Sequence, residues 1–170
     1  MKRYAIIAAL AILGAACGDS PTDPSDGPVV FTSALAASNE VPPVTNADRD
    51  ARGTVTITFS VPRDSAGVVT GPGTANFSAQ VSGFPAGTVA RAAHIHPGAA
   101  GVNGSPLVNT PLSPATAITL ADGTGSLNFS EVLISQADAQ AIINNPAGYY
   151  FNIHTNLTPG GAVRGQLVKQ

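Results

Sequence analysis

The chain has 170 residues, with 18 glycines, 14 prolines and only 11% charged residues. This composition is typical of one domain built from short strands and turns, and the length is enough for a hydrophobic core. The formal net charge is −2 and no stripe of basic residues occurs, so we expect no nucleic-acid partner.

Residues 1–17, MKRYAIIAALAILGAAC, have the pattern of a signal peptide, because basic residues precede an apolar run too short to span a bilayer. The segment resembles a bacterial lipobox ending in Cys17, although Leu13 is one place farther from the cysteine than usual. Cys17 is the only cysteine, and lipidation would explain a lone cysteine outside the cytosol. The alternative is an ordinary secreted protein. By resemblance to known sorting rules, Gly18 favours an outer-membrane or cell-surface lipoprotein.

Residues 18–28, GDSPTDPSDGP, predict a disordered tether, because they are rich in Pro, Asp and Ser and have almost no apolar surface to bury. The tether would hold the folded domain, residues 29–170, away from the membrane. Membrane attachment would then depend on the lipid at Cys17, since no later segment is long enough to span a bilayer.

Alternating residues predict strands in the rest of the chain. In GTVTITFSV (53–61) apolar residues alternate with Thr and Ser, and TANFSAQV (74–81) has a similar pattern. Further strands are predicted over 30–36, 88–96, 116–120, 125–133, 149–155 and 163–168. One short helix is predicted over 135–146, with Ser135 as its cap, Asp138 three residues on as in a capping box, and Pro146 as its stop. The pattern indicates an all-β fold, an antiparallel Ig-like or Greek-key β-sandwich with one short helix.

Four stretches in order resemble the CHRD domain, which is named for its occurrence in chordin. Three are FTSALAASNEVPPV (31–44), AAHIHPGAAGVNG (92–104) and GYYFNIHTNLTPGGAVRGQL (148–167), and the fourth is the helix-like segment before the last. The resemblance spans about 30–168 and implies an extracytoplasmic β-rich module, which in the animal protein accompanies growth-factor-binding modules. Ala162 departs from the family pattern, which often has an acidic residue two places before the arginine, here Arg164. A site that uses that carboxylate is therefore not expected.

All three histidines lie in these stretches. If the strand predicted around them is regular, His94 and His96 share one face with Ala90 and Ala92, while Arg91 and Ile95 face the other way. Residues two apart on a strand are separated by about 6.5–7 Å, a spacing that lets two imidazoles bind one ion.

His154 lies on another predicted strand, with Asn152 on the same face, so three imidazoles converge if the two faces meet. Three histidines with an open position are typical of catalytic zinc sites, and imidazole also suits copper. Calcium and magnesium are disfavoured because no Asp or Glu occurs between Ser65 and Ala121, and a blue-copper centre would need a cysteine ligand. Copper and zinc are therefore the candidate ions. The arrangement also resembles the copper side of Cu/Zn superoxide dismutases, which need further histidines that this chain lacks.

The same histidines could instead form a structural hydrogen-bonded network with Asn152, Thr155 and Arg164, since each ring can donate from one nitrogen and accept at the other. Glu40 precedes two prolines at a predicted edge or turn, where a solvated or capping carboxylate and a general acid are both conceivable. Arg164 could bind a carboxylate ligand or form an ion pair with Glu40.

No nucleophile motif, phosphate-binding loop or histidine with a nearby orienting Asp occurs, so no enzyme activity is predicted. The leading hypothesis is a surface-anchored, non-enzymatic module that binds a protein or polymer. The alternative is a copper- or zinc-binding protein that uses His94, His96 and His154, with superoxide dismutase-like activity as a third and weaker reading.

Overall fold

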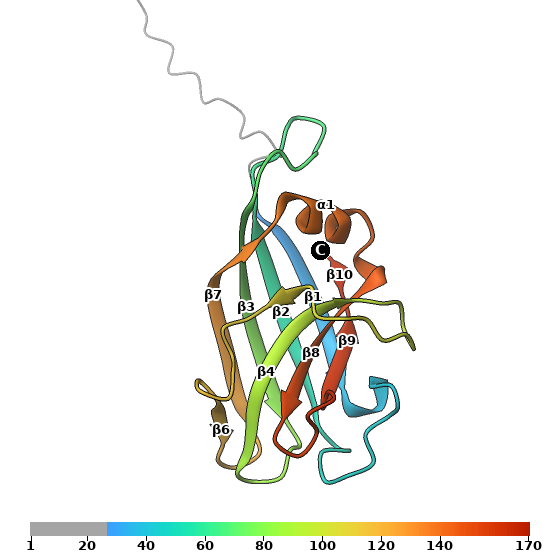
Figure 1. The fold of residues 1–170 in the computed structure, drawn as a ribbon, viewed down its shortest axis with the longest axis vertical. Coiled ribbons are helices and arrows are strands. Elements are labelled where there is room, and N and C mark those ends of the chain that lie inside the picture. The colour runs from blue at the N-terminus through green and yellow to red at the C-terminus, as the bar shows by residue number, and fades with distance from the viewer. Residues whose placement is uncertain (1–26) are drawn as a thin grey trace, which may run out of the picture.

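The computed structural model describes residues 27–170, so the predicted signal peptide, Cys17 and most of the tether lie outside the described residues (Figure 1). The strands are β1 Val29–Ala36, β2 Arg52–Ser60, β3 Gly73–Ser82, β4 Thr88–Pro97, β5 Val108–Asn109, β6 Ile118–Leu120, β7 Gly125–Ile134, β8 Tyr149–Thr155, β9 Val163–Gln166 and β10 Val168–Lys169. The helix α1 is Gln136–Asn144, and short 3₁₀ turns span Ala37–Asn39 and Pro146–Gly148. Within this part of the chain, no helix has the length and hydropathy needed to cross a membrane.

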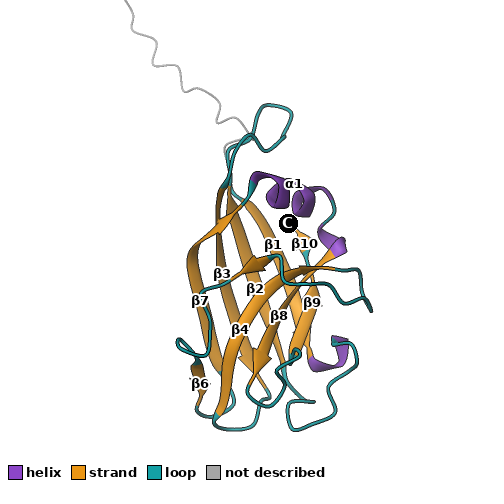
Figure 2. Ribbon diagram, in the orientation of Figure 1, coloured by secondary structure: helices purple, strands orange, loops and turns teal. Residues whose placement is uncertain are grey.

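The predicted strands are confirmed with small changes at their ends, and two differences are larger. The strand predicted over 163–168 is divided into β9 and β10 around the buried Leu167. The strand β5 was not predicted, because two residues show no period. Helix α1 covers one end of the domain (Figure 2), and the Ser135 hydroxyl accepts a hydrogen bond from the backbone N–H of Asp138, as the capping pattern predicts.

The strands form one continuous antiparallel sheet in the order β5-β4-β8-β9-β1-β2-β3-β7, with β10 paired to β1 and β6 paired to β4. β1 pairs with β2 along its whole length and with β9 and β10 on its other edge. Figure 1 shows β4, β8 and β9 lying in front of β1, β2 and β3, so the sheet folds over into a nearly closed, barrel-like form. This differs from the predicted Ig-like or Greek-key sandwich, in which two separate sheets pack face to face.

The hydrophobic core lies between the two halves of this folded sheet. The apolar residues of the alternating segments point inward, and Ile57 and Phe59 are fully buried. The Phe77 ring of β3 stacks on the Phe151 ring of β8 with 5.7 Å between centroids. Side chains that point the other way on β4, β8 and β9 therefore lie outside the core, where loops cover some of them.

A bulge in β4 decides which residues reach that outer face. Ala90 pairs with Thr155 and Ala92 pairs with His154, so Arg91 is an extra residue without a partner in the ladder. Ala90 is buried in the core and Arg91 is exposed. The prediction that Ala90 shares the histidine face while Arg91 points away from it is therefore wrong. The prediction follows from a regular two-residue period, and the bulge shifts that period by one residue.

Candidate metal centre

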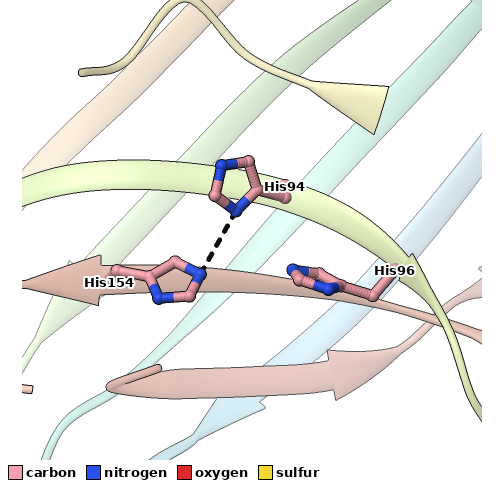
Figure 3. Close-up of side chains that lie close together, drawn as sticks. All are labelled: His94, His96 and His154. Atoms are coloured by element: carbon pink, nitrogen blue, oxygen red, sulfur yellow. Dashed lines mark hydrogen bonds between the residues drawn. The ribbon is translucent and has the colours of Figure 1, made fainter. Parts of the chain in front are cut away.

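Three imidazoles meet on the outer face of the sheet, two from β4 and one from β8. Each of His94, His96 and His154 has a ring nitrogen within 4.8 Å of a ring nitrogen of the other two. Figure 3 shows the three rings turned toward a common point, with Nδ1 of His94 3.2 Å from Nε2 of His154. The antiparallel pairing of β4 with β8 brings the three rings together. It sets His94 opposite Asn152 and His154 opposite Ala92, so His94 and His154 lie diagonally across the two strands.

Backbone carbonyls fix the orientation of two of these rings. Nδ1 of His154 lies 2.8 Å from the Pro159 carbonyl, and Nδ1 of His96 lies 2.9 Å from the Gly104 carbonyl. A carbonyl can only accept, so each of these two Nδ1 atoms carries the hydrogen, and each Nε2 atom presents a lone pair toward the cluster. Metal-binding histidines are usually oriented in this way by a hydrogen bond from the second ring nitrogen.

The predicted structural network accounts for only part of this arrangement. The Nδ1–H of His94 can donate to Nε2 of His154, which forms one histidine pair. Nε2 of His96, by contrast, is buried and has no hydrogen-bond partner among the described residues. Thr155, another predicted member, donates instead to the carboxylate of Asp48 at 2.6 Å. The cluster therefore retains a buried acceptor that the protein does not satisfy.

The three histidines are held in their neutral form. Burial, and then the nearby His154 and His96, lower the pKa of His94 to about 4. Burial is also the main cause that lowers the pKa of His96 and the pKa of His154. Neutral imidazole is the form that binds metal ions, so at neutral pH protons would compete little for these nitrogens.

Tyr150 on β8 lies directly opposite His96 in the β4–β8 ladder and supports its ring. Its ring stacks on that of His96 with 4.8 Å between centroids and an angle of 4° between the planes. The guanidinium of Arg164 lies 4.5 Å from the centre of the same ring. His96 is only 5% exposed, and its ring is held between the Tyr150 ring and the Gly104 carbonyl.

Arg164 connects the sheet to two loops that cover the outer face. These covering loops are the one after β1, which contains Asn39 and Glu40, and the one after β4, which contains Asn103. It is 1% exposed, and its Nε donates to the Asn39 carbonyl at 2.7 Å. Its Nη1 donates to Oδ1 of Asn103 at 2.8 Å, and Nε lies 4.0 Å from a carboxylate oxygen of Glu40. The structure thus favours the predicted ion pair with Glu40 over the predicted binding of a carboxylate ligand. Asn152 is also buried here, opposite Arg164 on the sheet.

Glu40 is a buried acid beside this cluster. Its carboxylate packs on Gly161, where a Cβ atom would lie 2.8 Å from both carboxylate oxygens. Burial raises the pKa of Glu40 from 4.5 to about 7, although Arg164 and Asn152 partly offset the effect. The carboxyl group is therefore largely protonated in the folded protein at mildly acidic pH.

This pKa predicts how the stability of a Glu40→Gln variant depends on pH. The unfolded chain loses the Glu40 proton near pH 4.5 and the folded chain near pH 7, so this residue makes the native protein less stable as the pH rises between these values. Glutamine cannot ionise, so the stability of the variant minus that of the native protein should rise by about 3 kcal/mol over this range. Urea unfolding at several pH values measures the free energy of unfolding of both proteins. The histidines titrate in both, so their contributions cancel in the difference. A difference independent of pH would contradict the raised pKa.

Several residues of the site are absent from the sequence-based prediction. Tyr150, Asn39 and Asn103 reach the cluster through strand pairing or loop position, and the carbonyls of Gly104 and Pro159 carry no side-chain signal. Only the stretch HIHPGAAGVNG (94–104) contains a signal for one of these groups: its glycines indicate a turn, which returns the chain so that the Gly104 carbonyl reaches His96. Of the predicted supporting residues, Glu40 lies beside Arg164 and Asn152 is paired with Arg164 on the sheet; their supporting role stays a prediction.

Comparison with known proteins identifies the type of domain. The family model described as the CHRD domain matches residues 31–167, which include every residue of the cluster and of the covering loops. A comparison with curated proteins found no match, and a comparison with solved structures found none either.

Proposed function

This chain belongs to the CHRD domain family, and we propose that it is an exported, lipid-anchored binding protein whose ligand is one copper or zinc ion. His94, His96 and His154 would hold the ion, and the role is binding rather than catalysis. Cys17 would carry the lipid, and the tether over residues 18–28 would hold the domain off the outer membrane or cell surface.

The convergence of the three ring nitrogens is the observation that carries this proposal. In a tetrahedral site with metal–nitrogen bonds of about 2.0–2.1 Å, ligand nitrogens lie about 3.3 Å apart. The distance of 3.2 Å between Nδ1 of His94 and Nε2 of His154 already fits such a site. An unsatisfied buried acceptor such as Nε2 of His96 costs about 1–3 kcal/mol, and a bound ion would remove that cost.

The ligand set supports copper or zinc over other common ions. The cluster offers three neutral imidazoles and no carboxylate. Calcium and magnesium prefer several oxygen ligands, whereas imidazole suits zinc and copper. Three protein ligands also leave a position open on a four-coordinate ion.

A protein or polymer partner is the second candidate. Leu133 on β7 is 83% exposed, and β7 is the last strand on its side of the sheet. An edge strand of this kind can pair with another chain. Such a partner would use a different surface from the histidines, so the two functions are compatible.

Metal titration of the chain that begins at Gly18 tests the proposal. This fragment contains all the described strands and the whole core, and it lacks the Cys17 thiol, which could bind copper on its own. After removal of metal with a chelator, calorimetric titration with Cu²⁺ or Zn²⁺ should show one equivalent bound to the native fragment. The substitution His94→Ala should abolish binding at that site, because a three-ligand site loses a ligand.

The matched control is Asn128→Ala, an exposed substitution on β7 that should leave the titration unchanged. The absence of one-equivalent binding by either ion would contradict the proposal. Binding that is the same in the native fragment and in His94→Ala would contradict it as well, since the ion would then lie elsewhere.

A further inference from the structure

A pocket of about 310 Å³ opens directly beside two of the three histidines. The bulge in β4 is the cause of its composition, because it places Arg91 on the outer face rather than the core side. The lining consists of an arginine, two histidines, two prolines and two small residues: Arg91, Ala92, His94, Pro114, His154, Thr155 and Pro159.

The pocket gives access to the histidine cluster from one side. His94 and His154 line it and are half-buried, whereas His96 is 5% exposed and does not line it. A ligand from solvent would therefore approach an ion held by the cluster past His94 and His154. The position that three histidines leave open on the ion is then expected to face this pocket.

The charges around the pocket favour an anion. The lining contains no Asp or Glu side chain. The Arg91 guanidinium makes no hydrogen bond or ion pair with any residue in the described part of the chain, 27–170. Asp48 lies behind Thr155, but it is fully buried and accepts hydrogen bonds from the hydroxyls of Thr155 and Thr158. A divalent ion and Arg91 would together present an excess of positive charge to the pocket.

We propose that this pocket binds a small monovalent anion, which takes the open position on the ion while Arg91 holds its outer end. This inference rests on the proposed metal site. Arginine suits this role because its planar guanidinium forms paired hydrogen bonds to carboxylates and similar anions. The prolines on the wall, Pro114 and Pro159, limit solvation of the bound anion and so strengthen its attraction to both positive groups.

Azide and formate are suitable probes, and the fragment from Gly18 is loaded with one equivalent of Cu²⁺, or of Co²⁺ as a coloured substitute for zinc. Addition of either anion should change the visible spectrum with a saturable one-to-one titration. The substitution Arg91→Gln should weaken anion binding about tenfold, which corresponds to loss of one charge-assisted hydrogen bond. Arg91→Lys should retain part of the affinity, because it keeps the charge without the planar fork.

The matched control is Arg52→Gln, because Arg52 is an exposed arginine on β2, which pairs with neither β4 nor β8. It should leave anion affinity unchanged, and none of the three variants should change metal stoichiometry. If the native fragment binds no metal, the proposed function and this inference both fail. If metal binds but the anions leave the spectrum unchanged, or if Arg91→Gln binds azide as tightly as the native fragment, only the anion pocket is refuted.

Discussion

Replacing Arg164 with methionine should lower the free energy of unfolding by about 3–5 kcal/mol, the usual cost of removing one partner of a buried charged pair. Methionine has a similar length and can still pack on Tyr150. It cannot donate to the Asn39 carbonyl or to Oδ1 of Asn103, and it leaves the Glu40 carboxylate buried without its cation. Both covering loops should loosen, because Arg164 contacts each of them.

Urea unfolding of the metal-free fragment at pH 8, where Glu40 is ionised, measures this effect. Arg52→Met is the control, since Arg52 is exposed and should change stability by less than about 0.5 kcal/mol. The double variant Arg164→Met with Glu40→Gln should recover part of the loss, because it removes the unpaired buried acid. A loss below about 1 kcal/mol in Arg164→Met would show that these contacts do not hold the loops.

Zinc should stabilise the native fragment by about 4 kcal/mol when its free concentration is about 1,000 times the dissociation constant. The reason is mass action, since the three ring nitrogens are brought together only in the folded chain. The variant His154→Ala lacks one of these nitrogens and should show almost none of this stabilisation at the same zinc concentration. Unfolding curves with and without zinc measure the effect.

Magnesium is the matched control ion, and it should leave the native curve unchanged because the cluster contains no oxygen ligand. The metal-free His154→Ala variant should remain folded, because the His154 side chain is half-buried on the outer face of the sheet and is not part of the hydrophobic core. Equal stabilisation of the native fragment and of His154→Ala by zinc would place the ion on other residues.

Local patterns in the sequence predict most of the strands and the helix. The alternation in 53–61 identifies β2, and Ser135 and Asp138 identify the start of α1. The closure of the sheet is not predictable in this way, because pairing of β1 with β9 and β10 joins residues more than 120 positions apart. The bulge at Arg91 is also hidden, because the neighbouring alanines give no hydrophobic period to reveal a shift.

The candidate site shows the same division between local and long-range information. The spacing of His94 and His96 predicts that they share a face, and the structure places both on the outer face of β4. The approach of His154 depends on the register between β4 and β8, which no local pattern specifies. The carbonyl groups that orient His96 and His154 come from loops, whose course is fixed by contacts such as those of Arg164.

Anomalous diffraction from crystals of the fragment grown with one equivalent of zinc tests the central claim most directly. The account predicts one zinc peak at about 2.0–2.1 Å from Nδ1 of His94, Nε2 of His96 and Nε2 of His154. Data collected on both sides of the zinc absorption edge would identify the element. An empty cluster under these conditions, or a peak bound only by other residues, would contradict the account.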